Sequence, residues 1–234
     1  MGKSSYQSPL FGSSDLNSPI LSVVIPTMNE PLIQPLVERV HESLNFVDHE
    51  IVVVDNSDQS PVLASARVFR QNSRGLGRAV LEGVAAARGG IVAIMDGDFS
   101  HRPQDLATMV KRLGSHDFVL GSRYVSQGKN LDIPYRRAVS MFFNRIARLF
   151  LGLEFADPMS GFIVIRKALF VKARPNPIGF KLNLELIYKS RRLGFNGTES
   201  PITFVPRLAG KSKAGLREAI RTLSYILTLR LREW

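Results

Sequence analysis

Short apolar runs rich in β-branched residues alternate with helical patterns over residues 21–122, and this alternation most limits the folds open to the chain. The runs cover 21–26, 50–55, 91–96 and 117–122, with a shorter one at 67–70. Helical patterns cover 32–46, about 76–88, and a segment from Pro103. Strands that are apolar on both faces and joined by helices form parallel sheets. The pattern therefore predicts an α/β fold with helices on both faces of the sheet.

The run at 91–101, IVAIMDGDFSH, ends abruptly in Asp96-Gly97-Asp98. Open α/β sheets bind their ligands at the carboxyl ends of the strands, and charged groups are rarely buried without a partner. Two carboxylates one residue apart at such an end indicate a hard divalent cation, Mg²⁺ or Mn²⁺, completed by substrate phosphates. An Asp-Gly turn on a surface loop is the alternative.

Polar residues follow other predicted strands as well, in the segments 27–30, 55–58 and 72–77. Each could be ordinary turn chemistry, but the strand ends of a doubly wound sheet converge on one crevice. The segment 75–79, Gly-Leu-Gly-Arg-Ala, lacks the third glycine of a dinucleotide fingerprint, and no P-loop pattern occurs. The crevice is compatible with a nucleotide, without support for a Rossmann cofactor or a P-loop.

The charge balance points to an anionic partner. The 234 residues include 31 Lys and Arg against 20 Asp and Glu, a net charge of +11, which favours nucleic acid, an acidic membrane surface or phosphorylated substrates. The chain has no cysteine, which excludes disulfides and thiolate metal sites and fits a reducing compartment. It has neither the roughly 18 to 20 consecutive apolar residues of a membrane span nor an apolar signal-peptide core.

The pattern changes after residue 125. A helix is expected at 134–151, with an apolar side formed by Met141, Phe142, Ile146, Leu149 and Phe150. Another is expected at 181–193, and a last one at 214–231 with a stripe of Leu216, Ile220, Leu223, Leu227 and Leu231. Arginines lie beside both apolar sides, and such helices either pack on the core or lie on a membrane surface. The sequence leaves both open.

Seven segments together resemble glycosyltransferase family 2, and more closely its dolichol-phosphate (polyprenol-phosphate) mannosyltransferases. The segments are VVIPTMNE (23–30), VVVDNSDQS (52–60), NSRGLGRAV (72–80), MDGDFSHRP (95–103), GSRY (121–124), DPMSGF (157–162) and RLAGKSKAG (207–215). They stand in the family's order and cover nearly all of 20–215. The resemblance implies one nucleotide-sugar-binding (GT-A type), Rossmann-like domain with a mostly parallel sheet flanked by helices.

The resemblance also implies roles for individual residues. The catalytic residues would be Asp98, Arg123 and Asp157, and the Mg²⁺ or Mn²⁺ ligands Asp96, Asp98 and Ser100. The nucleotide sugar would be bound by Pro26, Met28, Glu30, Val53, Asp55, Gly75, Asp96, Gly97, Arg207 and Lys213. The lipid phosphate would be held by Arg123, Arg137 and Ser140.

Three positions depart from the family pattern. Met28 replaces a usual tyrosine and removes ring stacking on the base. Asn56 replaces the second aspartate of a common pair, and Ser100 stands where some relatives have glutamine. The first two leave the nucleotide open, and the third implies a weaker metal contact.

We therefore expect a flexible tail at 1–19, a catalytic domain at 20–213 and a basic amphipathic helix at 214–234. The expected reaction is inverting, metal-dependent transfer of mannose from GDP-mannose to a polyprenyl or dolichyl monophosphate. The enzyme would be peripheral, on the cytoplasmic side of a membrane, held by an anionic surface or by a transmembrane partner subunit.

Three alternatives compete with this expectation. A UDP-sugar such as UDP-glucose could be the donor to the same lipid. The pI of 10.3 is compatible with a nucleic-acid-binding protein. The sequence carries no signature of nucleic-acid recognition, so no nucleic acid partner is expected. A catalytically silent regulatory subunit is disfavoured because Asp96, Asp98, Arg123 and Asp157 are all present.

Overall fold

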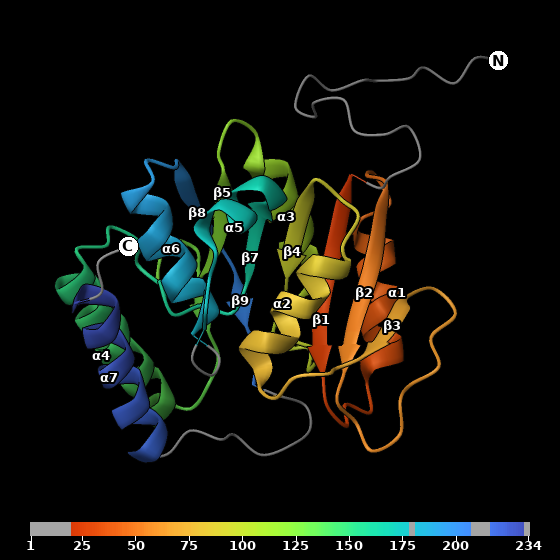
Figure 1. Cartoon of the computed structure of the whole chain (residues 1–234), viewed down its shortest axis with the longest axis horizontal. Helices are drawn as coiled ribbons and strands as arrows, with labels where there is room; N and C mark the ends of the chain where they lie inside the picture. Colours follow the sequence, from red (N-terminus) through yellow and green to blue (C-terminus); the bar gives the residue numbers. More distant parts are fainter. Residues whose placement is uncertain (1–19, 178–180, 207–215, 232–234) are drawn as a thin grey trace.

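A computed structural model describes residues 20–177, 181–206 and 216–231. Its centre is a seven-stranded sheet in the order β3-β2-β1-β4-β7-β5-β8 (Figure 1). The strands are β1 (Leu21–Thr27), β2 (His49–Asp55), β3 (Arg67–Arg70), β4 (Ile91–Ile94), β5 (Phe118–Ser122), β7 (Ile163–Arg166) and β8 (Gly197–Pro201). The α/β fold with a mostly parallel sheet is confirmed.

The first four strands are all parallel, as predicted. β1 pairs with β2 in the register Leu21↔His49 and with β4 in the register Leu21↔Ile91. Their carboxyl ends therefore lie at one edge of the sheet, the lower edge in Figure 1. The strand predicted at 91–96 ends at Ile94, so Asp96 already belongs to the turn that follows.

β7 is antiparallel and lies between β4 and β5. The sequence analysis does not anticipate this strand, because its four residues show no alternation that distinguishes a strand from a short helix. Running against its neighbours, β7 begins where β4 ends, with Ile163 opposite Ile94. The segment 157–161 is thereby brought beside the turn after β4.

Helices cover both faces of the sheet and define two apolar layers. On one face lie α1 (Ile33–Ser43) and α3 (Pro103–Leu113), and on the other α2 (Leu76–Ala86), α5 (Lys167–Ala173) and α6 (Leu182–Arg192). Buried β-branched residues of alternating strand positions divide between the layers, with Val23 and Ile25 in the first and Val24 in the second. The sheet therefore separates two core layers and is apolar on both faces, as its apolar strands require.

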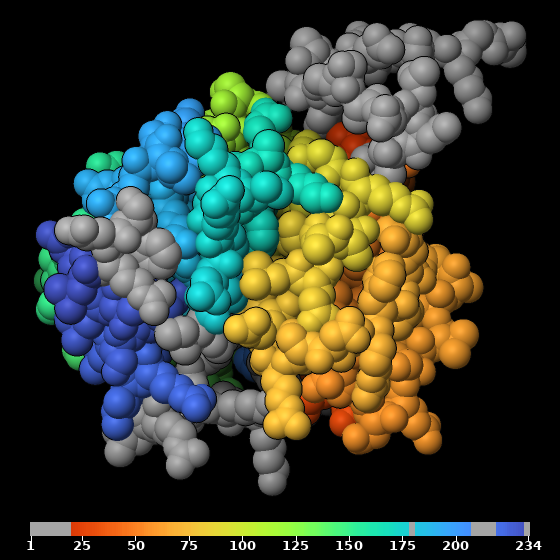
Figure 2. All heavy atoms as spheres, viewed as in Figure 1, coloured from red at the N-terminus to blue at the C-terminus, as the bar shows by residue number. Residues whose placement is uncertain are grey.

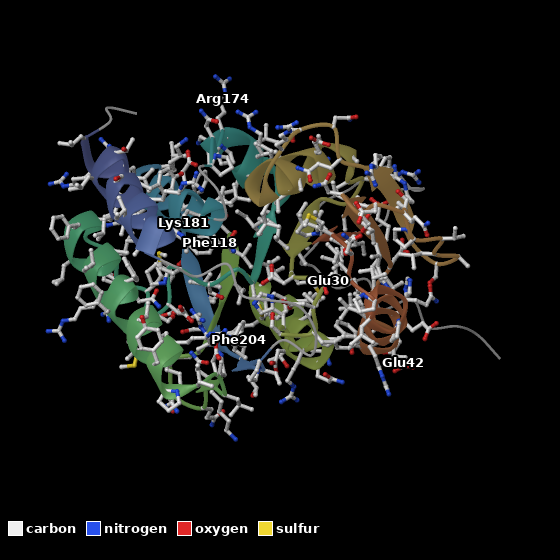
Figure 3. All side chains as sticks on the ribbon, turned by 90° about the horizontal axis from the view of Figure 1, so that it is seen from below. Glu30, Glu42, Phe118, Arg174, Lys181 and Phe204 are labelled. Atoms are coloured by element: carbon white, nitrogen blue, oxygen red, sulfur yellow. The ribbon has the colours of Figure 1, made fainter. Side chains whose placement is uncertain are left out.

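Helices α4 (Pro134–Leu151) and α7 (Leu216–Leu231) lie side by side at the edge remote from β3 (Figures 1 and 3). A two-stranded ladder of β6 (Lys129–Asn130) and β9 (Thr203–Phe204) completes the described elements. The predicted helix 134–151 agrees with α4, and the prediction at 181–193 with α6. The predicted tail 1–19 and residues 207–215 and 232–234 lie outside the described residues, so the division at residue 213 stays a prediction.

Most side chains of the predicted apolar sides of α4 and α7 are exposed, although Ile146 of α4 is partly buried and packs against the core. On α4 the buried residues are Asn144, Ala147 and Leu151, and large side chains of the predicted apolar side are exposed: Met141, Phe142, Leu149 and Phe150. On α7 the buried positions are Thr222, Tyr225, Ile226 and Leu229, whereas the predicted stripe is exposed at Ile220, Leu223, Leu227 and Leu231. Figure 2 shows α7 on the molecular surface. The sequence left open whether the predicted apolar sides pack on the core or lie on a membrane surface. In the structure it is mainly the opposite sides of these helices that pack on the core.

Candidate active site

The turn after β4 holds the predicted metal-binding residues against the end of the sheet. Asp98 and Ser100 are buried, and the Asp98 carboxylate accepts a hydrogen bond from the Ser100 N–H at 3.0 Å. Phe99, between them, has a positive φ of 60°. Left-handed backbone at a residue with a side chain is uncommon and clusters at functional sites. The turn thus places two carboxylates and a hydroxyl in one tightly wound segment.

His101 fills the inside of this turn. It is buried, and its Nδ1 accepts the Asp96 N–H at 3.1 Å. Burial lowers the pKa of His101, and an accepting Nδ1 belongs to the neutral ring. Four predicted charges act on this histidine electrostatically, those of Asp96, Asp98, Arg123 and Asp157. The fold has therefore gathered residues from three distant segments around one buried side chain.

The hydrogen bonding of the Ser100 hydroxyl indicates whether a divalent cation fits the turn. Its Oγ is buried and has no hydrogen-bond partner within the described part of the chain. Hydroxyl and carboxylate oxygens are the hard ligands that Mg²⁺ and Mn²⁺ accept. Within the described ranges no group of three or more His, Cys, Asp or Glu could hold a metal. The donor set fits a cation that completes its coordination with substrate phosphates.

A cavity of about 320 Å³ opens between the ends of β1 and β2. It is lined by Thr27, Asn29, Glu30, Pro31, Ile33, Ser57, Gln59 and Pro61. The Thr27 Oγ1 is buried without a hydrogen-bond partner among the described residues. Glu30 lies at this end of the molecule (Figure 3). Of the residues predicted for the nucleotide, Glu30 lines this cavity.

A second, smaller cavity of about 30 Å³ lies on the other side of β1. Its lining joins two predicted residues, Pro26 and Asp96, to Gly161 and to Leu182 and Asn183 of α6. The Asn183 Oδ1 is buried and lacks a partner in the described structure, while its Nδ2 donates to the Ser160 carbonyl at 2.9 Å. A hydroxyl-bearing ligand would satisfy that oxygen.

Asp55 and Val53 do not line the first cavity. Val53 is fully buried in the core, and the Asp55 carboxylate accepts hydrogen bonds from Ser57 at 2.5 Å and Ser60 at 2.7 Å. Burial alone would raise the pKa of Asp55, but these hydroxyls and the charge of Arg70 outweigh it and lower the pKa. Asp55 therefore shapes the 55–60 turn and leaves Ser57 to line the cavity.

Two of the departures from the family pattern touch each other. The Asn56 Nδ2 donates to the Met28 sulfur at 3.6 Å, and both side chains are exposed. Gly97 lies close to the end of β1, so that an added Cβ would come 3.4 Å from the Pro26 carbonyl oxygen. Gly75 precedes α2 with φ of 98°, which favours glycine.

Arg123 and Asp157 form a largely buried ion pair, in which the Arg123 side chain keeps 13% exposure. The Asp157 side chain has no exposed surface, and its Oδ2 accepts Arg123 Nε at 2.7 Å while Oδ1 accepts Nη2 at 2.8 Å. The Arg123 backbone N–H also donates to Asp157, at 3.0 Å. Burial by itself would lower the pKa of Arg123, but the carboxylate outweighs it and raises the pKa. The guanidinium is therefore a fixed cation, while Nη1 makes no hydrogen bond to a described residue.

The structure links this ion pair to the turn after β4 through Phe204 of β9. The Arg123 guanidinium lies 5.2 Å from the Phe204 ring centroid, and the His101 ring lies 5.8 Å from it. The Val205 N–H donates to the Ser100 carbonyl at 3.1 Å. The turn after β4 and the ion pair thus both contact the segment of β9 and Val205.

The remaining predicted residues divide between α4 and the undescribed segment. Arg137 is exposed and Ser140 half-buried on α4. Arg207 and Lys213 lie outside the described residues. Sequence reasoning missed Thr27, Asn144, Gly161, Asn183 and Glu199 as site residues. Thr27 and Gly161 stand inside the quoted segments, whereas a lone buried asparagine leaves no signal in a single sequence.

Solved structures of similar fold define the class. Glucosyl-3-phosphoglycerate synthase from Mycobacterium tuberculosis, crystallised with Mn²⁺ and UDP, has a TM-score of 0.65 and 22% identity over 91% of this chain and 79% of that one. A mycobacterial protein has a TM-score of 0.71 and 19% identity, over 91% and 74%. The fold is thus the GT-A fold.

The family follows from sequence. The model for glycosyl transferase family 2 matches residues 22–173, and the chain belongs to this family. A dolichol-phosphate mannosyltransferase of Pyrococcus furiosus is 31% identical over 92% of this chain but 64% of that protein, so the chain spans under two thirds of it. Proteins of the same name from Mycosarcoma maydis (33%, over 93% of this chain and 81% of theirs) and Saccharomyces cerevisiae (33%, over 89% and 86%) are matched over most of their length.

Proposed function

We propose that this glycosyltransferase transfers mannose from GDP-mannose to a polyprenyl or dolichyl monophosphate, with inversion, at a membrane surface. The names of the relatives at 31% and 33% identity support the substrate pair. The observation that carries the proposal is the position of the exposed apolar sides of α4 and α7. The buried side of α4 is joined to the ion pair of the Arg123 cation, because Asn144 donates a hydrogen bond to Asp157.

The donor would bind along the ends of β1, β2 and β4. The nucleoside would occupy the larger cavity beside Glu30, and the diphosphate would lie at Asp96 and Asp98. These two carboxylates and the Ser100 hydroxyl would hold Mg²⁺ or Mn²⁺, which stabilises negative charge on the diphosphate leaving group. Pro26, Met28, Val53, Asp55, Gly75 and Gly97 would shape this region, and Arg207 and Lys213 would complete it.

The acceptor phosphate would be held by Arg123, Arg137 and Ser140. A phosphomonoester has a second pKa of about 6, so it is ionised at neutral pH and needs no general base to attack the sugar. Asp157 is unsuited to be that base, because its oxygens already accept four hydrogen bonds from Arg123 and Asn144. Its contribution would be to fix the cation that receives the phosphate. Attack opposite the leaving group would give the β-mannoside.

The membrane would be reached through α4 and α7. Within the described residues, no helix has the length and apolar character to cross a bilayer. Exposed apolar area of this extent marks an interaction surface, and arginines beside it, each worth about 1 kcal/mol near an anionic leaflet, suit a lipid surface. We place the enzyme peripherally on the cytoplasmic side, and a transmembrane partner subunit is the competing anchor.

Transfer assays test the reaction. The chain is incubated with anionic vesicles, Mn²⁺, and labelled GDP-mannose or UDP-glucose, with a polyprenyl monophosphate or the matching alcohol as acceptor. We expect a β-linked mannolipid from GDP-mannose and the monophosphate, and none from the alcohol. Comparable transfer to both lipids would refute the mechanism without a base.

UDP-glucose is the second candidate donor. Met28 offers no ring to stack on a base, so the nucleoside pocket lacks one feature of its relatives. Faster transfer from UDP-glucose than from GDP-mannose would replace the first proposal by this one.

A further inference from the structure

Asn144 is a polar residue on the buried side of α4. Its exposed fraction is 2%, and the other buried residues of this helix are Ala147 and Leu151. A buried amide needs hydrogen-bond partners, because leaving it unpaired costs more than burying an apolar side chain. An asparagine here, in a helix whose large apolar side chains point outward, therefore indicates a specific polar contact.

The amide of Asn144 clamps α4 to the segment that precedes β7. Its Nδ2 donates to Asp157 Oδ1 at 3.0 Å and to the Ser140 carbonyl at 3.1 Å. Its Oδ1 accepts the Met159 N–H at 3.0 Å. Both ends of the amide are thus used, which also fixes which atom is oxygen and which is nitrogen.

The same segment is held from the other side by Glu199 of β8. Its carboxylate accepts the N–H groups of Ala156 at 2.8 Å and Asp157 at 3.0 Å. Glu199 therefore fixes the backbone of Asp157, and Asn144 fixes its carboxylate. Arg123 takes its direction from that carboxylate through two parallel hydrogen bonds, the geometry that orients a guanidinium most strongly.

We propose that Asn144 is a positioning residue that makes the direction of the Arg123 guanidinium depend on the seating of α4. The proposal rests on the proposed function, because it gives the acceptor phosphate to Arg123 and the membrane to the outer side of α4. The helix that meets the lipid would then align the cation that receives the lipid's phosphate. The hydrogen bond from Asn144 to Asp157 is the direct link between this helix and the ion pair.

The substitution Asn144→Asp provides the sharpest test. It keeps the shape and the acceptor for Met159, but it removes the donor and places a carboxylate about 3 Å from Asp157, where two carboxylates tend to share a proton. When the introduced carboxyl group is protonated, it can again donate to Asp157. The other charged or titratable side chains acting there are Arg123 from the end of β5, Glu199 from β8 and His101 from the turn after β4.

Transfer by Asn144→Asp is measured against the parent chain from about pH 8 down to about pH 5.5, so that titration of the acceptor phosphate cancels in the ratio. We expect a loss of at least about tenfold at the alkaline end, in kcat/KM for the lipid phosphate, with partial recovery on acidification. Donor affinity, followed as the thermal shift with GDP, should change less than about twofold. A ratio that stays flat across the range would overturn the proposal.

Leu151→Ala is the matched control. It removes buried apolar contact from the same side of α4 without touching Asp157, so it should lower the melting temperature and leave the pH dependence of the ratio flat. If Leu151→Ala and Asn144→Asp show the same pH profile, Asn144 is merely structural and the proposal fails.

A measurement without turnover separates this proposal from the proposed function. The Arg123 Nε–H resonance, assigned with Arg123→Lys, should shift in Asn144→Asp and move back on acidification. An unchanged resonance overturns the positioning role. Absence of lipid transfer by the parent chain would instead overturn the proposed function, while the resonance still reports on Asn144.

Discussion

The two sides of the proposed site are held together in different ways. On the donor side, at the ends of β2 and β4, the key carboxylates are fixed by near neighbours: Asp55 by Ser57, two residues away, and Asp98 by Ser100, also two away. On the acceptor side, Arg123 and Asp157 are 34 residues apart, and Asp157 and Glu199 are 42 apart. Each donor-side carboxylate thus has a partner inside its own turn, although the turns also contact one another, whereas the acceptor-side ion pair exists only when several elements have packed.

This difference predicts unequal stability costs. Asp157→Ala leaves the buried Arg123 charge without its partner, and breaking a buried pair typically costs about 3–5 kcal/mol. Arg70→Ala also removes an ion pair, with Asp55, but Arg70 is half exposed and the Ser57 and Ser60 hydroxyls remain, so its cost should be about 0–1 kcal/mol. Urea unfolding of both variants measures the contrast. Equal costs would break the comparison.

On the donor side, a substitution should affect activity more than stability. Asp98→Ala removes a charged group at a strand end, so activity should fall by at least about a hundredfold while the free energy of unfolding stays nearly unchanged. The melting-temperature rise produced by Mn²⁺ with GDP should also disappear. Near-parental activity in Mn²⁺ buffer would show that the turn after β4 is not the metal site.

Membrane binding should belong to the acceptor side alone. Replacing Phe142 and Leu149 together by serine removes apolar surface that would enter the interface, and should weaken sedimentation with anionic vesicles by at least about tenfold. Val62→Ser is the control, because Val62 is a 97% exposed apolar residue of the donor side. Vesicle binding by the parent chain should also weaken as salt rises. If Val62→Ser has the larger effect, or the parent chain ignores anionic vesicles at low salt, docking by α4 and α7 is wrong.

The smallest expected effect is an acid-dependent one at the amino-terminal end of β2, away from both sides of the site. Burial alone would raise the pKa of Glu50, but hydrogen bonds from the Arg88 backbone, Arg67 and Ser22 outweigh it and lower the pKa below 4.5. A lowered folded-state pKa adds stability above the unfolded value and loses it as pH falls. The difference in unfolding free energy between the parent chain and Glu50→Gln should therefore be constant above about pH 5.5 and shrink below about pH 4.5. Activity at neutral pH should not change, and a difference that grows on acidification would contradict the assignment.

The same contrast decided what the sequence could predict. The parallel strands and the turn at 96–100 follow from local patterns: an apolar run, its abrupt end and two carboxylates. Asn144 and Glu199 could not be found, because their roles come from contacts with residues 13 and 42 positions away. The antiparallel strand β7 was not predicted for a similar reason, since its place is set by pairing with β4 and β5.

The helices α4 and α7 show a second limit. The spacing of leucines and phenylalanines predicted one apolar side for each helix, but the buried side of α7 is apolar as well, with Tyr225, Ile226 and Leu229. The spacing left open whether the predicted side faces the core, because an apolar stripe has the same period whether it packs on protein or on lipid. The inner side of α4 packs through Asn144 and Ala147. One is polar and the other is small, so an amphipathic pattern does not mark them as core residues.

The antiparallel strand β7 has a consequence for how the molecule can be divided. It lies between β4 and β5, so the segment that carries Asp157 leads into a strand in the middle of the sheet, next to β4, which the turn with Asp98 follows. A fragment ending near residue 125 would expose the facing edges of β4 and β5, both fully buried and apolar, which is a template for aggregation. Split-protein complementation with a break there should give insoluble amino-terminal fragments unless both pieces are made together. The donor and acceptor sides could then not be separated into independently folding pieces.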